Sequence, residues 1–203
     1  MPDAEIVPRA GFYGKLPARG DFLRAGLPRG FVETWDGWLQ RVIAGSRAAL
    51  GTGWVAAWME APIWRFALPP GLCGEDAVLG LWMPSVDRAG RHFPLTAALV
   101  LPDAASMDDA RAAAWMARAE EAALEALMHD LPPDALGDRL AAAWVEGPGA
   151  AADLSPVARG LSVWWTDGAP LVPPGRMLLP GLPDIARFAA MLDSRAASGE
   201  GKG

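Results

Sequence analysis

Large apolar residues recur at helical spacing in the first quarter of the chain. They are separated by four, three and four positions: Phe31, Trp35, Trp38 and Val42. Residues at this spacing lie on one face of an α-helix. Pro28 suits the start of a helix, and Gly51 and Gly53 suit its end. The pattern therefore predicts an amphipathic helix over residues 29–50.

Strand-like patterns lie on both sides of this helix. Residues 11–16 form a short segment that ends at Pro17. After the helix, four segments are typical of strands: 54–58, 63–68, 78–83 and 93–101. Three of them alternate between two sets of side chains, whereas residues 78–83 are continuously apolar and suit a central strand. Because the connections are short and contain Gly or Pro, we expect an antiparallel meander.

The second half of the chain predicts three helices and one further strand. Ser106 is expected to cap a long helix that carries Asp108 and Asp109 in its first turn and ends before Pro132. The other predicted elements are a helix over 134–144, a strand over 161–165 and a helix from the cap Asp184 to residue 192. The stretches 18–28 and 168–183 are expected to form turns and irregular structure.

This order of elements indicates a single α/β domain of the α+β class over residues 1–193. Its antiparallel sheet must bury two faces, so helices are expected to flank it on both sides. Residues 194–203 are expected to form a disordered tail.

The composition fits a globular protein. Of the 203 residues, 52% are hydrophobic and ten are Trp, and Cys73 is the single cysteine, so no disulfide can form within the chain. The first ten residues lack the apolar core of a signal peptide. The longest apolar runs are shorter than the roughly 20 residues that cross a bilayer. We therefore expect a cytoplasmic protein without membrane insertion.

Charge is unevenly distributed along the chain. The net charge of −6 argues against nucleic acid as a partner, since phosphate binding needs a basic surface. Residues 9–47 carry seven cationic against three acidic side chains, whereas residues 103–153 carry eleven acidic against three cationic ones. A basic N-terminal face and an acidic helical face could each attract a partner, or both could be ordinary solvated surfaces.

Motifs for catalysis, phosphate binding and metal binding are missing from the sequence. G-x-x-x-x-G-K-[ST], G-x-G-x-x-G and G-x-S-x-G do not occur. The two histidines, His92 and His129, do not lie at metal-ligand spacing from Cys73. The prediction is a protein without catalytic residues, metal or cofactor.

One catalytic alternative stays open. Ser85, Asp87 and His92 lie within eight residues and could serve a hydrolase as nucleophile, orienting acid and base. The competing interpretation is a turn whose polar side chains hydrogen-bond to its own backbone.

Three polar clusters are not explained by core packing. They are Gly14–Phe22, Met83–Leu95 and Trp164–Gly168, and each combines glycine with charged side chains. One interpretation is an internal ion-pair network in which Asp21 or Asp87 pairs with a nearby arginine: Arg19, Arg88 or Arg91. The other is a surface that binds a partner.

These clusters belong to longer segments that match a known pattern. The segments are GFYGKLPARGDFLRAGLPRGFVETWDGWL, MPSVDRAGRHFPLTAAL, SVWWTDG and GLPDIARFAAML, and together they span most of the chain. The sequence resembles the TagF family, also called ImpM, which is associated with bacterial type VI secretion. The resemblance implies a fold similar to longin or SRX-type domains, in which an antiparallel sheet lies between helices.

The resemblance also implies a function. Proteins of this family are expected to be non-enzymatic, post-translational repressors of type VI secretion that bind the forkhead-associated scaffold protein of the apparatus. The oligomeric state stays open. The candidate partner-binding residues are Lys15, Arg19, Asp21, Phe22, Asp87, Arg88, Arg91, Trp165 and Asp167.

We expect the docking surface in the N-terminal basic stretch together with the turn over residues 85–92. A small-molecule sensor with a pocket around Arg91 and Trp165 is a further alternative. A second contact through the acidic helix over residues 106–130 is also left open.

Overall fold

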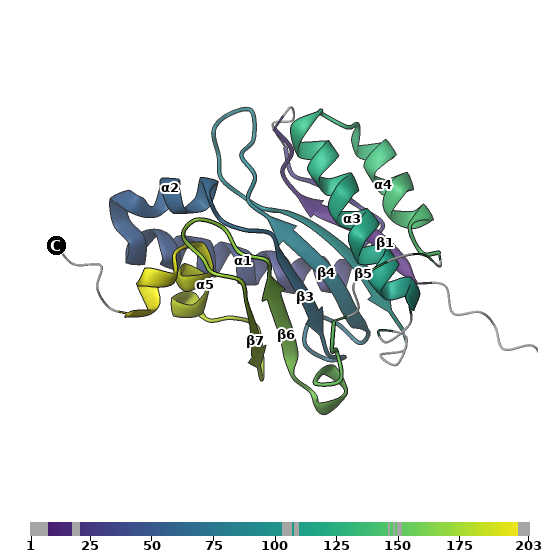
Figure 1. Cartoon of the computed structure of the whole chain (residues 1–203). Coiled ribbons are helices and arrows are strands. Elements are labelled where there is room, and N and C mark those ends of the chain that lie inside the picture. Colours follow the sequence, from purple (N-terminus) through teal and green to yellow (C-terminus); the bar gives the residue numbers. More distant parts are fainter. Residues whose placement is uncertain are drawn as a thin grey trace, which may run out of the picture.

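Seven antiparallel strands of the described chain form one sheet in the order β2-β1-β5-β4-β3-β6-β7 (Figure 1). The computed structural model describes residues 8–17, 21–102, 107, 110–145, 147, 149 and 152–198. The strands are β1 (Arg9–Gly14), β2 (Leu23–Ala25), β3 (Trp64–Leu68), β4 (Ala77–Met83), β5 (Leu95–Leu101), β6 (Ser162–Thr166) and β7 (Gly175–Leu179). The predicted antiparallel meander is confirmed for β3, β4 and β5.

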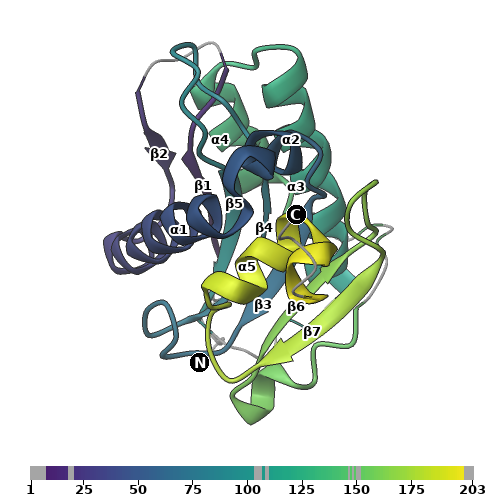
Figure 2. The same ribbon diagram turned by 90° about the vertical axis from the view of Figure 1, so that its left-hand side faces the viewer.

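Helices cover both faces of the sheet (Figures 1 and 2). On one face lie α1 (Arg29–Leu50), α2 (Trp54–Met59) and α5 (Ile185–Leu192). On the other face lie α3 (Ala110–Met128) and α4 (Pro133–Ala142). Three 3₁₀ segments complete the described elements: η1 (Gly51–Gly53), η3 (Val157–Arg159) and η4 (Ser194–Ser198). The predicted α+β class, with helices on both sides of an antiparallel sheet, is confirmed.

The centre of the sheet is apolar because it is covered twice. Every residue of β4 and of β5 is buried. A strand that packs against helices on both faces has no position left for solvated side chains. The continuous apolar run at residues 78–83 therefore reflects the central position that the sequence predicted.

Tryptophans dominate the core on the α1 face. Trp35 of α1 stacks on Trp164 of β6, with ring centroids 6.1 Å apart and planes 4° from parallel. Trp35 Nε1 also donates a hydrogen bond to Thr96 Oγ1 at 3.0 Å, and Trp38 Nε1 donates one to the Pro183 carbonyl at 2.8 Å. These buried indoles join α1 to the sheet and to the segment before α5, and their N–H groups are satisfied inside the core.

Residues 54–58, predicted as a strand, form a helix instead. Trp54 and Trp58 are four residues apart, a spacing that fits one helical face as well as one strand face. In α2 their rings stack with centroids 5.0 Å apart, and Trp54 Nε1 donates to Ser46 Oγ at 2.9 Å. The prediction was wrong because five residues are too few to separate the two periods, and packing against α1 favours the helix.

Two edge strands were missed by the sequence patterns. β2 lies within the stretch 18–28 and β7 within the stretch 168–183, both of which were predicted as irregular. β2 is only three residues long, and β7 is exposed at three of its five positions. Edge strands pack against fewer neighbours, so their sequences carry little apolar alternation.

The predicted cap of α5 is present, whereas the predicted cap of α3 lies outside the described residues. Asp184 caps α5 as predicted, because its Oδ1 accepts a hydrogen bond from the Arg187 backbone N–H at 2.8 Å. The predicted cap Ser106, with Asp108 and Asp109, lies outside the described residues. Within the predicted tail, Ser194–Ser198 form the 3₁₀ segment η4, and residues 199–203 lie outside the described part.

Candidate functional site

The three polar clusters lie at one end of the sheet. They follow β1, β4 and β6, which run in the same direction because each is separated from the next by one antiparallel strand. The register places Gly14 opposite Leu95 and Leu95 opposite Met83, so β1 and β4 end level with each other. Segments far apart in the sequence therefore leave the sheet at the same end (Figure 1).

An ion pair joins the first two clusters. We call residues 15–22 the N-terminal loop and residues 84–94 the hairpin loop. Lys15 Nζ lies 2.5 Å from Asp87 Oδ2, and both side chains are buried. A second contact runs parallel to this one, because Ser85 Oγ donates to the Lys15 carbonyl at 2.8 Å. The two loops are thus held together by a charged and a neutral hydrogen bond.

Asp87 also organises the hairpin loop itself. Its Oδ1 accepts hydrogen bonds from the backbone N–H groups of Ala89 and Arg91, at 2.9 and 2.8 Å. Its Oδ2 accepts a further bond from Arg91 Nε at 2.7 Å. Burial alone would raise the pKa of the Asp87 carboxyl, but the bonds from Lys15, Arg91 and Ala89 outweigh it and hold the pKa well below its usual range. Asp87 is therefore ionised and fully partnered in the folded protein.

Three aromatic rings cover the buried ion pair. Phe22 meets Phe93 edge-on with centroids 4.7 Å apart and stacks on Tyr13 at 6.0 Å. Lys15 Nζ lies 4.6 Å from the centre of the Phe22 ring, which is a cation–π distance. Phe22 is nevertheless 49% exposed, so one side of its ring faces solvent. Phe22 therefore presents part of an aromatic ring to solvent while it packs against Tyr13, Phe93 and Lys15.

The residues proposed for hydrolysis do not form a catalytic arrangement. Ser85 Oγ is bonded to the Lys15 carbonyl, and Asp87 is bonded to Lys15, Arg91 and Ala89. His92 packs edge-on against Trp54, at 5.2 Å between ring centroids, and burial together with the charge of Arg47 lowers its pKa. The geometry matches the alternative interpretation, in which these side chains build the turn.

The predicted partner-binding residues divide into supports and exposed positions. Lys15 and Asp87 are supports, because their side chains are only 3% and 0% exposed. Of the internal network that the sequence left open, the Asp87–Arg91 pair is formed, and Lys15, which that network did not include, is a second partner of Asp87. The exposed positions in the two loops are Asp21, Phe22, Arg88 and Arg91. Arg19 lies outside the described residues.

An apolar groove lies beside the two loops. It has a volume of about 310 Å³ and is lined by Pro17, Met59, Pro84, Ser85, Val86 and Leu127. The N-terminal loop, the hairpin loop, α2 and α3 all contribute to it. Met59 and Leu127 were not among the predicted binding residues, because an apolar residue near a helix end cannot be told from an ordinary core residue by its sequence pattern.

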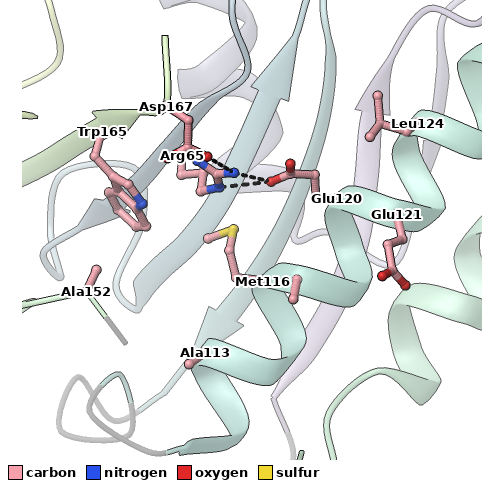
Figure 3. Close-up of a pocket in the computed structure, with 10 residues that line it drawn as sticks. Arg65, Ala113, Met116, Glu120, Glu121, Leu124, Ala152, Trp165 and Asp167 are labelled. Carbon is pink, nitrogen blue, oxygen red and sulfur yellow. Dashed lines mark hydrogen bonds and ion pairs between the residues drawn. The ribbon is translucent and has the colours of Figure 1, made fainter. Parts of the chain in front are cut away.

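The third cluster lines a different pocket, between α3 and the sheet (Figure 3). Its volume is about 510 Å³, and Trp165 and Asp167 lie on the sheet side. Arg65 of β3 contacts Glu120 of α3, with 2.7 Å between Nη2 and Oε2, and Asp167, with 2.8 Å between Nη2 and Oδ2. Arg91 does not line this pocket, so the sensor pocket predicted around Arg91 and Trp165 is not formed by those two residues together.

Sequence reasoning missed Arg65 and Glu120. The available signal was weak: Arg65 is a single charge within a strand that is otherwise apolar. A charge at such a position needs a partner from another element, here α3, and the sequence does not say which element that is.

Among the described residues, no group of three or more His, Cys, Asp or Glu side chains is placed to hold a metal ion. None of their helices combines the length and the apolar character needed to cross a membrane.

Comparison with known proteins identifies the family. The model of the family described as TagF N-terminal domain, Type VI secretion system-associated, matches residues 11–143, which is more than half of the chain. The crystal structure of PA0076 from Pseudomonas aeruginosa PAO1, at 2.05 Å resolution, is similar with 35% sequence identity and a TM-score of 0.76. That similarity covers 91% of this chain and 94% of PA0076. A comparison with curated proteins gave no match. The chain belongs to the TagF family of type VI secretion-associated proteins.

Proposed function

We propose that the protein represses type VI secretion after translation, in the cytoplasm, by binding the forkhead-associated scaffold protein of the apparatus. The docking surface in this proposal is the exposed side of the N-terminal loop and the hairpin loop, with the apolar groove beside them. The activity is binding and not catalysis.

One observation supports this proposal most directly. Two segments that characterise the family, separated by about seventy residues, meet at one end of the sheet and are fixed by the buried Lys15–Asp87 pair. Their polar residues do not assemble a nucleophile with a base. Loops that carry exposed side chains are a typical arrangement for protein recognition, and the buried Lys15–Asp87 contact joins these two loops before a partner binds.

The chemistry of the surface also suits a protein partner. Phe22 is a half-exposed aromatic ring in the N-terminal loop, and Arg88 and Arg91 are exposed in the hairpin loop. Aromatic residues and arginine are the side chains that most often carry the affinity of protein interfaces. The groove beside them offers apolar contacts from Met59 and Leu127. Repression by binding further requires that this protein bind the inactive state of the scaffold more tightly than the active state.

The experiment measures co-purification of the tagged scaffold protein with this chain, and secretion of the substrates of the system into the medium. The test variants are Arg88→Glu and Asp21→Lys, whose side chains are exposed and which leave the buried ion pair intact. We expect both variants to lose most of the scaffold binding and to release secretion. Lys15 and Asp87 are left unchanged, since their loss would disturb the fold of both loops.

Arg41→Glu is the matched control, because it makes the same charge change as Arg88→Glu at an exposed position of α1. It should bind and repress as the wild type does. Melting temperatures show whether each variant is folded. Wild-type scaffold binding by the folded loop variants would overturn the surface, and absence of binding by the wild type would overturn the partner.

A further inference from the structure

The pocket between α3 and the sheet has one apolar wall and one aromatic wall. Ala113, Met116 and Ala117 line it from α3, and Trp165 faces them from β6 (Figure 3). Trp165 belongs to a characteristic segment of the chain, and it packs against the core on the α3 face while staying only partly buried. Its neighbour Trp164 is the one that fills the core on the opposite face.

Acidic side chains outnumber cationic ones among the residues that line the pocket. Arg65 is the one cation among the lining residues, and its side chain is 15% exposed. Three carboxylates line the same pocket: Glu120, Glu121 and Asp167. Arg65 pairs with Glu120 and with Asp167, so its charge is already engaged twice. The nearest cation on the next strand, Arg176, opposes Trp165 in the β6–β7 register and lies 3.5 Å from Asp153.

We propose that this pocket binds a cationic side chain, arginine or lysine, that projects from a partner protein. Such a side chain has an aliphatic stem and a charged end. The stem would lie along Met116 and the alanines of α3, as long cationic side chains do on apolar surfaces. The charged end would lie over the Trp165 ring and next to the Asp167 carboxylate, which combines a cation–π contact with an ion pair.

An anionic ligand is disfavoured by the same geometry. It would have to displace Asp167 from Arg65, a contact of 2.8 Å, and to approach Glu120 and Glu121. Like charges at these distances repel.

The open rim of the pocket favours a protein side chain over a free small molecule. Asp167 is 84% exposed, whereas sites for small molecules bury most of the ligand surface. The pocket and the apolar groove both adjoin α3, because Leu124 lines the pocket and Leu127, about one helical turn further along, lines the groove. A partner that covers the groove could place a side chain in the pocket, but the proposal does not depend on the identity of that partner.

The test is a titration of the full chain, labelled with ¹⁵N, with Nα-acetyl-arginine amide. The indole N–H signal that is present in the spectrum of the wild type and missing from that of Trp165→Phe belongs to Trp165. We expect the arginine derivative to shift this signal saturably. The uncharged citrulline derivative, which has nearly the same shape, should bind about threefold to tenfold more weakly because the charge contacts are missing. The glutamate derivative should cause no saturable shift.

Asp167→Asn is the test variant, since its exposed side chain can change without disturbing the core. It should weaken binding of the arginine derivative, whereas the matched control Glu75→Gln, in the loop between β3 and β4, should leave it unchanged. Equal binding of the citrulline derivative, stronger binding of the glutamate derivative, or no saturable shift with arginine would each overturn the proposal. These results are independent of scaffold binding, so the two proposals can fail separately.

Discussion

Lys15 Nζ and Asp87 Oδ2 lie 2.5 Å apart, and the two side chains are 3% and 0% exposed. The residues are separated by 72 positions in the sequence and connect the end of β1 with the hairpin loop. A buried charge without a partner is costly, so each residue fixes the position of the other. The N-terminal loop and the hairpin loop therefore behave as one structural unit.

Lys15→Met should destabilise the protein strongly. The methionine fills a similar volume but leaves the Asp87 carboxylate without its buried counter-ion. Loss of one member of a buried pair corresponds to a fall in melting temperature of roughly 10 °C in a domain of this size. Thermal unfolding followed by circular dichroism measures the change.

A double-mutant cycle isolates the contribution of the pair. Lys15→Met combined with Asp87→Asn removes both charges, so we expect the double variant to lose less stability than the sum of the two single variants. Additive losses would contradict a direct interaction between the two residues. Arg29→Met is the control. The ion pair between Arg29 and Glu33 is on the surface and should add almost nothing to the free energy of unfolding.

The ionised state of Asp87 predicts a dependence of stability on pH. Contacts with Lys15, Arg91 and Ala89 hold the pKa of this carboxyl below its ordinary value of 3.8, despite burial. The unfolded chain therefore binds a proton at higher pH than the folded one does. The stabilisation is fully present above the unfolded pKa and is lost as the pH falls from about 4 toward 2.

Urea unfolding at a series of pH values tests this dependence. Asp87→Asn should be less stable than the wild type at pH 6, and its stability should fall less steeply below pH 4. Glu75→Gln should keep the slope of the wild type. Parallel curves for Asp87→Asn and the wild type would show that Asp87 does not cause the loss.

The sequence predicted most of the elements whose apolar pattern is long. The face formed by Phe31, Trp35 and Trp38 correctly predicted α1, and the uninterrupted run in β4 correctly predicted a central strand. Such patterns succeed because burial against two layers imposes them on many consecutive positions. Short elements gave no such signal, which is why α2 was predicted as a strand and the edge strands β2 and β7 were missed.

The candidate surface was only partly predictable for a different reason. The segments around Lys15 and Asp87 stood out in the sequence, but which of their residues are buried depends on the order of strands in the sheet. β1 lies between β2 and β5, although β3 and β4 come before β5 in the sequence. The same pairing decides that Lys15 supports the loop from inside, whereas Arg88 stays on the surface.

Gly14→Ala should severely destabilise the protein or prevent folding. Gly14 has a φ of +139°, and a Cβ atom at this position would lie 2.0 Å from the Pro94 carbonyl oxygen. Backbone cannot move aside there without breaking the pairing of β1 with β5. We expect a loss of at least about 3 kcal/mol, measured by urea unfolding.

Gly37→Ala is the matched control for this substitution. Gly37 lies within α1, and its added Cβ atom would meet nothing within 4 Å. Alanine is the better helix former, so this variant should gain about 0.5–1 kcal/mol. Equal stability of the two variants would show that the close approach of Gly14 to Pro94 is not a constraint on the fold.

Two buried tryptophans should respond differently to replacement by phenylalanine. Trp38 Nε1 donates to the Pro183 carbonyl at 2.8 Å, whereas Trp82 Nε1 has no hydrogen-bond partner among the described residues. Trp38→Phe removes apolar volume and also leaves a buried carbonyl without its donor, but Trp82→Phe removes volume alone and relieves an unsatisfied N–H group. We expect Trp38→Phe to cost about 1–2 kcal/mol more than Trp82→Phe, measured by urea unfolding at neutral pH. An equal or larger loss for Trp82→Phe would mean that its N–H group is satisfied in solution, and that volume alone decides the stability of this core.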